Sequence, residues 1–398
     1  MTDDIPTGWK AANGMHVLTP ADYATLAAYA ELDDLVLELF AGPGGMSEAL
    51  KLAGLPPMKS LGVEWDASAC MTAVSNGHPR LHADLTQLDP RMFGKVWGFH
   101  GSPSCQGFSM AGKGESRGDT DLLLMAIEAM GNEPDRADEI MAIFRQHAKS
   151  KLSSLSLEPL RYILALRPEW FTLEQVRAVL PLWEAYAAVL RPLGYSVWTG
   201  VESSEKFGVP QTRERALAMG SLVHDLSDGL KQTHSRYIRA GKRRGQLEPG
   251  LLPYVTMAQA LERAADFEVV SNYGTGGDPK DRGTRTGDEP AATVTSKVGR
   301  NKITHMGDVR NAHGCVRTLD APSPTLTSSM DNGNFQWGDG TRNDGVPVSV
   351  REAGILQSFP ADYIWVGNRT KQYEQVGNAV PPLLGQALAE TAIGKREA

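Results

Sequence analysis

The sequence predicts an α/β protein in which a large lobe with a mostly parallel sheet carries a smaller inserted lobe. From Leu35 to Gly220, short apolar runs alternate with helical patterns, which is typical of strand–helix–strand units. After Gly220 the composition shifts to Gly, Thr, Asn and Arg with many turns, and helical patterning returns only at Val350–Phe359. We therefore expect an N-terminal extension (1–33), a large lobe from both ends of the chain (34–220 with 351–398), and an inserted lobe (221–350).

Six apolar runs are predicted to be the strands of the large lobe, because the strands of a parallel sheet are buried on both faces. These runs are Leu35–Phe40, Ser60–Glu64, Val96–Gly101, Trp170–Val176, Tyr195–Glu202 and Ala216–Gly220. Helices are expected between them at Met46–Leu52 and at Ala178–Leu190, the second of which ends before a Pro and Gly stop signal. A final apolar helix, which runs to Ile393, should dock back on this lobe.

The stretch 118–158 is longer than a crossover connection needs, and it predicts additional helix. Its charged residues are expected to cover a solvent-exposed face: Asp135, Arg136, Asp138, Glu139, Arg145, Lys149 and Lys151.

One internal repeat lies in the inserted lobe. Arg285–Ser296 aligns with Arg317–Ser328 at an offset of 32 residues. The alternating Thr and Val or Leu residues favour a duplicated strand–turn unit. A row of Thr hydroxyls can also hydrogen-bond phosphates, so a structural and a DNA-contacting interpretation both stay open.

Composition excludes several protein classes. The 398 residues are 41% hydrophobic and 22% charged, which rules out a disordered tail, a disulfide scaffold and a collagen. Cys70, Cys105 and Cys315 are far apart and form no C-x-x-C pair, so neither a disulfide framework nor a zinc site is expected. The sequence shows no signal peptide and no membrane-spanning run, which indicates a cytosolic chain. The net charge of −7 argues against a uniformly basic nucleic-acid binder.

A glycine-rich turn follows the first predicted strand. Phe40-Ala41-Gly42-Pro43-Gly44-Gly45 lies at the carboxyl edge of the sheet, where open α/β sheets bind ligands. The turn lacks the full G-x-G-x-x-G spacing, and no G-K-[ST] follows it. Alone it is weak evidence for a nucleotide-like ligand.

Two acidic residues strengthen that interpretation. Glu64 ends the second strand twenty residues after Gly44, a separation at which a carboxylate contacts ribose hydroxyls in such folds. Asp84 ends the next segment, in a place to accept from an adenine amino group. Either residue alone is more often a surface acid, but the two together behind a glycine turn favour an adenosine-containing cofactor.

A thiol lies in a loop at the same sheet edge. Cys105 follows the Val96–Gly101 strand within Pro103-Ser104-Cys105-Gln106. A lone Cys is more often buried and inert, but its place beside Gly and Ser residues just past a strand end makes it a candidate nucleophile.

Six motifs follow one another along nearly the full chain. They are Phe40-Ala41-Gly42-Pro43-Gly44, Pro103-Ser104-Cys105-Gln106, Leu173-Glu174-Gln175-Val176, Gln211-Thr212-Arg213-Glu214-Arg215, Arg351-Glu352-Ala353-Gly354-Ile355-Leu356-Gln357-Ser358-Phe359-Pro360 and Gly377-Asn378-Ala379-Val380-Pro381. In this order they are highly specific, and the chain resembles cytosine-C5 DNA methyltransferases of the bacterial type. The resemblance implies a Rossmann-like sheet that binds S-adenosylmethionine, releases S-adenosylhomocysteine, and carries an inserted target-recognition domain.

The resemblance also implies a reaction. Cytosine C5 is a poor nucleophile, so the Cys105 thiolate would add to C6 and make C5 reactive toward the sulfonium methyl group. Glu174 would share or donate a proton at N3, where electron density develops. Arg213 and Arg215 would hold the base carbonyl and the catalytic loop, although a Q-x-R-x-R segment seen alone could be a salt-bridged strand edge. The sequence does not name the base that removes the C5 proton.

The resemblance assigns the remaining contacts. Asn378 would close the cofactor site, although outside the family context it reads as a helix cap. The expected cofactor contacts are Phe40, Ala41, Gly42, Gly44, Gly45, Glu64, Trp65, Asp84, Pro103, Asn378 and Ala379. The expected DNA contacts are Gln106, Ser109, Lys231, Arg236, Arg239, Arg243, Arg244, Arg285 and Arg317. No metal is expected.

Two positions depart from the family pattern. Ser104 stands where the family usually has Pro before the nucleophile, so a rigid backbone constraint is lost. Gln175 stands where Asn commonly follows the catalytic Glu, and its longer amide changes how the loop is held. Neither change removes a reacting group, so an active enzyme is expected.

The charge is unevenly distributed. Six basic residues and no acid occur from Lys231 to Arg244, a segment we call the basic strip. Ser221–Val350 holds 16 basic and 15 acidic residues, a net charge of +1, so the rest of the chain carries −8. A basic strip can engage phosphates while the other lobe stays acidic.

The leading hypothesis is therefore a monomeric cytoplasmic, nucleoid-associated DNA (cytosine-5) methyltransferase that acts on double-stranded DNA by base flipping. A cognate restriction endonuclease is a possible partner. RNA cytosine-5 methylation and a catalytically silent DNA-binding protein are the alternatives.

Overall fold

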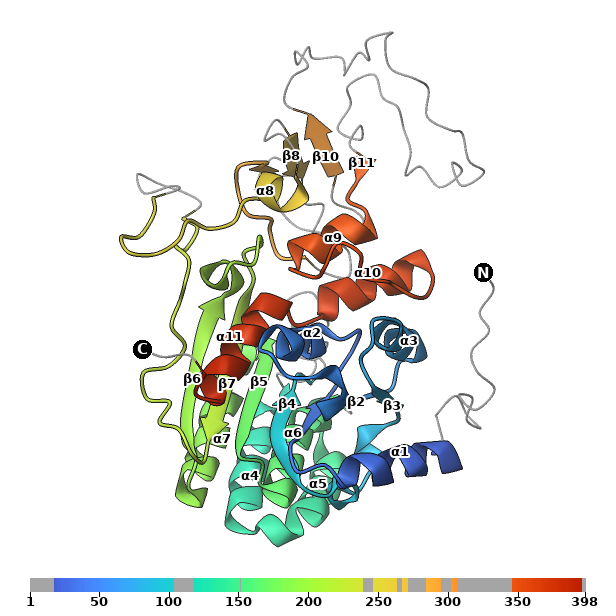
Figure 1. Cartoon of the computed structure of the whole chain (residues 1–398). Coiled ribbons are helices and arrows are strands. Elements are labelled where there is room, and N and C mark those ends of the chain that lie inside the picture. The colour runs from blue at the N-terminus through green and yellow to red at the C-terminus, as the bar shows by residue number, and fades with distance from the viewer. Residues whose placement is uncertain are drawn as a thin grey trace.

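A seven-stranded mixed sheet forms the centre of the molecule (Figure 1). The computed structural model describes residues 18–103, 118–150, 152–238, 246–262, 267–270, 284–294, 302–305 and 346–395. The strand order is β3-β2-β1-β4-β5-β7-β6. The strands are β1 (Leu35–Leu39), β2 (Ser60–Glu64), β3 (Arg80–His82), β4 (Val96–Gly101), β5 (Trp170–Val176), β6 (Ser196–Ser203) and β7 (Glu214–Ser221).

The sheet is parallel from β3 to β5, and β7 runs antiparallel to both β5 and β6. The predicted α/β fold is confirmed. β3 was not predicted from the sequence; it has three residues and, among the described strands, pairs only with β2. β7 begins two residues earlier than predicted, because its pairing with β5 and β6 continues to Arg215 and beyond.

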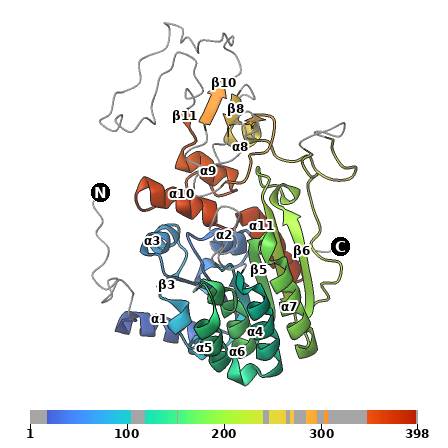
Figure 2. The same ribbon diagram turned by 180° about the vertical axis from the view of Figure 1, so that it is seen from behind.

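Helices cover both faces of this sheet, as the two opposite views show (Figures 1 and 2). One face packs against α4 and α7 through a cluster that contains Leu37, Ile127 and Trp183. The other face packs against α2 and α11 through Val36 and Leu388. The helices are α1 (Pro20–Ala30), α2 (Gly45–Leu52), α3 (Ala67–Ser75), α4 (Thr120–Asn132), α5 (Ala137–His147), α6 (Glu158–Leu166), α7 (Leu180–Leu190), α8 (Met257–Leu261), α9 (Val350–Leu356), α10 (Arg369–Asn378) and α11 (Pro382–Ala392).

The last helix, α11, docks back against α2 and the seven-stranded sheet, as predicted. Leu384 and Leu388 of α11 share a buried cluster with Met46 and Leu50 of α2, which is among the first helices of the chain. Burial of these side chains joins the two ends of the chain in one core. No helix among the described residues is long and apolar enough to cross a membrane.

The 118–158 stretch contains α4, α5 and the first residue of α6. Its charges mostly face solvent as predicted, since Asp135, Arg136, Asp138, Glu139, Arg145 and Lys149 are exposed. Lys151 lies outside the described residues.

A second sheet forms a separate layer beyond α9 and α10 (Figure 1). Its four short strands pair antiparallel in the order β11-β10-β8-β9. They are β8 (Phe267–Val270), β9 (Thr284–Thr286), β10 (Lys302–His305) and β11 (Val346–Pro347). The first copy of the internal repeat begins within β9, and the second copy lies outside the described residues.

Candidate active site

The glycine-rich turn joins β1 to α2 in a backbone conformation that excludes most side chains. Phe40, Gly42 and Gly44 have φ angles of 56°, 53° and 108°. A Cβ on Gly45 would lie 2.2 Å from the Val380 carbonyl oxygen, so that side of the turn is closed by the C-terminal segment. Among the described residues, a Cβ on Gly42 would meet only the Phe40 carbonyl oxygen, at 3.9 Å. With respect to the part of the chain that the structure describes, the turn is therefore packed on one side and open at Gly42.

Glu64, at the end of β2, holds this turn. Its Oε2 accepts a hydrogen bond from the Gly42 amide at 2.9 Å, and its Oε1 accepts from the amides of Trp65 and Asp66 at 2.9 and 2.8 Å. Burial raises the pKa of the Glu64 carboxyl, although these amide hydrogen bonds oppose the shift. The neighbouring indole of Trp65 is 76% exposed. An aromatic face thus lies open beside an ordered carboxylate.

Asp84 lies at the same edge, because β2 and β3 are paired and the Ala83 amide donates to the Glu64 carbonyl at 3.0 Å. Its Oδ1 accepts from the Thr86 amide at 3.0 Å and from the Thr86 hydroxyl at 2.8 Å, which caps a short turn at Leu85–Gln87. The structure therefore brings together the two acidic residues and the glycine turn, as the sequence predicts.

Glu174 is the buried carboxylate of the site, on β5. Its Oε1 lies 2.8 Å from Arg215 Nε and 3.9 Å from an Arg213 terminal nitrogen. The antiparallel pairing of β5 with β7 brings Arg215 beside it. Among the described residues Oε1 makes these ion pairs but accepts no aligned hydrogen bond. The two arginines thus balance the charge of Glu174, and its Oε1 can still accept a hydrogen bond.

Arg213 also ties three parts of the chain together. It is 2% exposed, and one terminal nitrogen donates to the Gly377 carbonyl at 2.9 Å and to the Val294 carbonyl at 3.1 Å. It therefore links the buried carboxylate on β5 to the C-terminal segment and to the segment that follows β9.

Gln175 holds the beginning of the loop that carries Cys105. Its buried side-chain amide donates to the Pro103 carbonyl. The sequence marks Gln175 as a departure from the family pattern, and in the structure its amide contacts Pro103, the last described residue before Cys105. Cys105, Gln106 and Ser109 lie outside the described residues.

The C-terminal segment closes the glycine turn, and Tyr363 is a residue of this contact that sequence reasoning did not find. The Tyr363 hydroxyl donates to the Pro43 carbonyl at 2.6 Å, and Tyr363 packs with Phe359 and the buried Ala379. Asn378, the last residue of α10, is exposed. The aromatic spacing from Phe359 to Trp365 was the available signal, since these rings pack on one another.

Arg285 does not fit the predicted DNA-contacting role. Its guanidinium is buried and donates to the Pro290 carbonyl at 2.6 Å and to the Thr212 hydroxyl at 2.9 Å. It also lies over the Tyr237 ring, with 5.0 Å between its Cζ and the ring centroid. Arg285 is therefore not placed to contact a phosphate. Its hydrogen bonds join the first copy of the repeat to the Gln211–Arg215 segment.

The repeat makes further contacts with that segment through a backbone carbonyl and a Thr hydroxyl. The Thr212 amide donates to the Ala291 carbonyl at 2.8 Å, and the Thr293 hydroxyl donates to the Thr212 carbonyl at 2.8 Å. These bonds support the structural interpretation of the repeat's first copy.

Two residues of the basic strip are exposed at the protein surface. Arg236 pairs with Glu214 at 3.1 Å, and Lys231 lies 3.9 Å from Asp228. The other predicted DNA-contacting cations lie outside the described residues: Arg239, Arg243, Arg244 and Arg317.

Comparison with known proteins gives a family match over most of the chain. The family model described as C-5 cytosine-specific DNA methylase matches residues 35–133 and 144–394. Its two segments include the glycine turn, the β5 carboxylate, the arginine pair and the C-terminal segment.

Individual relatives agree with this match. The chain is 28% identical over 375 residues to the Type II methyltransferase M1.HphI of Haemophilus parahaemolyticus, covering 90% of this chain and 86% of the relative. It is 26% identical over 405 residues to the Type II methyltransferase M.DdeI of Desulfomicrobium norvegicum, covering 89% and 87%. The crystal structure of S. pombe Dnmt2 methyltransferase covers 90% of this chain and 98% of its own, with a TM-score of 0.52 and 19% identity, and shares the fold.

Proposed function

The chain belongs to the C-5 cytosine-specific DNA methylase family, and from this premise we propose how its residues methylate DNA. It is a DNA (cytosine-5) methyltransferase. The observation that best supports the following assignment is the buried Glu174 carboxylate, balanced by Arg215 and Arg213 at the sheet edge that also carries the glycine turn. The similarity to Type II methyltransferases disfavours the RNA and non-enzymatic alternatives.

The proposed methyl donor is S-adenosylmethionine, and the residues at the glycine turn fit it. The open backbone at Gly42 admits a ligand close to the chain, and Glu64 and Asp84 supply ordered carboxylates at neighbouring strand ends. Trp65 offers an exposed ring face for an adenine. When bound, the cofactor supplies the methyl group. Phe40, Ala41, Gly44, Gly45, Pro103, Asn378 and Ala379 complete the proposed set.

Cys105 is the proposed nucleophile. Its thiolate adds to cytosine C6, and the ring electrons move toward N3, where Glu174 shares or donates a proton. C5 then takes the methyl group. A base or a water path accepts the C5 proton, and the C6–S bond breaks to restore the aromatic ring and the thiolate. Burial of Glu174 strengthens its interaction with the base, because water does not screen it there.

Arg215 and Arg213 are proposed to have different roles. Arg215 is the more exposed of the two and lies against Glu174, so it orients the carboxylate and is available to the base carbonyl. Arg213 is almost fully enclosed, and its hydrogen bonds to Gly377 and Val294 make it a positioning residue that joins the lobes.

The chain is proposed to divide as the composition indicates, with 34–220 and 351–398 catalytic and 221–350 reading DNA. Gln106, Ser109, Lys231, Arg236, Arg239, Arg243, Arg244 and Arg317 remain the proposed DNA contacts. We propose a cytoplasmic, nucleoid-associated monomer, and the names of its relatives support a restriction-modification context with a cognate endonuclease.

Incubation of the purified protein with S-adenosylmethionine labelled on the methyl group tests this function. Label should enter duplex DNA and not an RNA duplex of the same sequence. Label in RNA alone would favour the RNA alternative, and label in neither polymer would favour a silent DNA-binding protein.

Gln175→Ala is expected to lower kcat about 10- to 100-fold, because the hydrogen bond to the Pro103 carbonyl is lost and the loop carrying Cys105 is misplaced. Steady-state kinetics with saturating DNA and S-adenosylmethionine measure this effect. The exposed Gln146→Ala is the matched control. Wild-type kcat in Gln175→Ala would contradict the role of this amide.

Charge reversal in the basic strip, with Arg239, Lys242 and Arg243 changed to Glu, is expected to weaken DNA binding about 10- to 100-fold at low salt and to flatten its salt dependence. Fluorescence anisotropy across a salt series measures both quantities. Reversal of three exposed cations of the catalytic lobe, Arg91, Lys95 and Arg136, is the control with equal charge change. Equal losses in the two triple variants would show that the basic strip has no specific role.

A further inference from the structure

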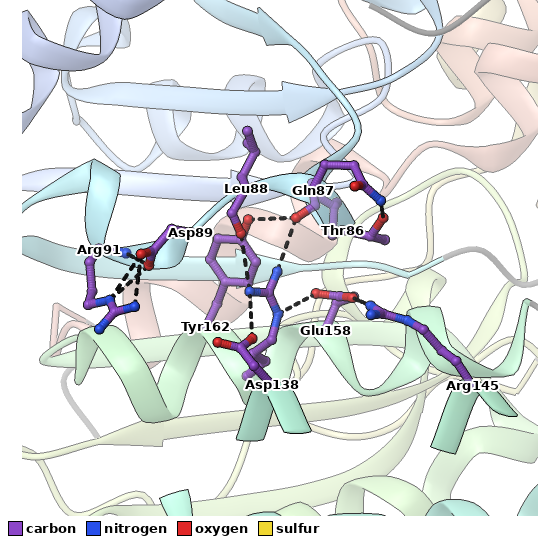
Figure 3. Close-up of polar contacts among 11 residues, drawn as sticks. Thr86, Gln87, Leu88, Asp89, Arg91, Asp138, Arg145, Glu158 and Tyr162 are labelled. Carbon is purple, nitrogen blue, oxygen red and sulfur yellow. Dashed lines mark hydrogen bonds and ion pairs between the residues drawn. The ribbon is translucent and has the colours of Figure 1, made fainter. Parts of the chain in front are cut away.

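A buried ion pair lies on α6, within the network of polar contacts drawn in Figure 3. Glu158 and Arg161 are 0% and 5% exposed and form an ion pair with 2.8 Å between Oε2 and Nε. Burying two charges is costly unless their remaining hydrogen-bonding groups are satisfied. The partners of this pair therefore indicate what it does.

Arg161 directs its two terminal nitrogens at the turn that follows β3. One donates to the Leu85 carbonyl and the other to the Leu88 carbonyl, each at 3.1 Å. The Tyr162 hydroxyl, next along α6, donates to the Leu85 carbonyl at 2.9 Å, and its ring lies under the guanidinium. Three hydrogen bonds from two adjacent residues thus hold one short turn. Figure 3 labels Tyr162 and Leu88, the donor of one of these bonds and the acceptor of another.

That turn begins at Asp84, whose carboxylate caps it through Thr86. Asp84 is also the proposed adenine contact. The turn has no strand pairing of its own, since β3 ends at His82 and β4 begins at Val96. The position of the Asp84 carboxylate therefore depends on the contacts that hold Leu85 and Leu88 from α6.

The 118–158 stretch supplies the charges that balance this arrangement. Arg145 of α5 donates to Glu158 Oε1 at 2.7 Å, and Asp138 of α5 lies 3.3 Å from an Arg161 terminal nitrogen. Burial raises the pKa of the Glu158 carboxyl, which the two arginines oppose. Burial is the largest single effect on Arg161 and acts to lower its pKa, but Glu158, Tyr162 and Asp138 together outweigh burial and the pKa is raised. The additional helix α5 thus contributes one contact to each member of the buried pair.

We propose that Arg161 and Tyr162 are positioning residues for the adenosine end of the cofactor site, with α5 as their support. This inference rests on the proposed cofactor. Holding the turn in place before the ligand arrives reduces the ordering cost of binding. A purely structural role would change thermal stability and leave cofactor affinity unchanged at temperatures well below unfolding.

Tyr162→Phe and Arg161→Lys test the proposal. Tyr162→Phe removes one hydroxyl and leaves both Arg161 hydrogen bonds in place, so the protein should fold and bind S-adenosylmethionine about 3- to 10-fold more weakly. Arg161→Lys keeps the positive charge but loses the planar guanidinium that donates to both the Leu85 and the Leu88 carbonyl. This variant should bind S-adenosylmethionine about tenfold more weakly. Arg136→Ala, on the exposed surface just before α5, is the matched control.

Isothermal titration calorimetry measures the affinity, and steady-state kinetics provide an independent readout. The KM for S-adenosylmethionine should rise by the same factor as Kd, while the KM for DNA and kcat stay at the Arg136→Ala values. Folded variants with wild-type cofactor affinity would overturn this inference alone. A wild-type protein that binds no S-adenosylmethionine would overturn the proposed cofactor and this inference with it.

Discussion

Replacing Cys105 by alanine is expected to abolish methyl transfer to DNA, lowering kcat by about 10⁴-fold or more. Without a thiolate to add to C6, cytosine C5 stays too weak a nucleophile to take the methyl group. Transfer of labelled methyl groups to duplex DNA measures the loss. Affinity for S-adenosylmethionine, measured by calorimetry, should be retained, because the proposed cofactor contacts are unchanged.

Cys70→Ala is the matched control for this result. Cys70 is buried in α3, and burial raises the pKa of its thiol well above the ordinary value, so it is not a thiolate at neutral pH. Its removal should leave turnover near the wild-type rate. Turnover retained in Cys105→Ala would rule out the nucleophile assignment, whatever the control shows.

Glu174→Gln is expected to lower kcat about 10²- to 10⁴-fold with a smaller change in the KM for DNA. The amide keeps the shape of the side chain but cannot share a proton with cytosine N3, and it no longer balances Arg215 and Arg213. Single-turnover methyl transfer measures the chemical step directly.

Glu169→Gln provides the comparison for Glu174→Gln. Glu169 precedes the other end of β5 and accepts from the Trp97 indole at 3.0 Å, a contact that a glutamine oxygen preserves. This variant should retain wild-type kcat. A Glu174→Gln enzyme as fast as Glu169→Gln would remove Glu174 from the chemistry.

The large lobe could be predicted because its signals are local. The predicted bounds of Ser60–Glu64, Val96–Gly101 and Trp170–Val176 agree with β2, β4 and β5. These strands are apolar runs buried on both faces, so composition alone marks them. Because the carboxyl ends of parallel strands share an edge, the sequence also placed Glu64 beside the glycine turn.

The contacts between lobes could not be predicted, because they depend on pairing across long sequence separations. Arg285 has the charge of a phosphate contact, and only the structure shows its guanidinium buried against Thr212 and Pro290. Arg161 is similar, since neither its burial nor the turn it holds leaves a local pattern. For such arginines, the sequence shows that the side chain is positively charged but does not show which groups it contacts.

The net charge of −7 is compatible with a DNA substrate once it is divided by segment. The inserted segment is slightly positive, and the described helices of the 118–158 stretch expose both signs of charge, away from the second sheet (Figure 1). DNA affinity should therefore depend on one part of the chain and on ionic strength.

Bisulfite sequencing of DNA from cells that express the protein tests the central claim most directly, because it reports both the reaction and the sequence that is read. Cells with the wild-type protein should show protected cytosines at one recurring sequence, and cells with Cys105→Ala should show none. The absence of protected cytosines with the wild-type protein, or the same pattern with Cys105→Ala, would contradict the account.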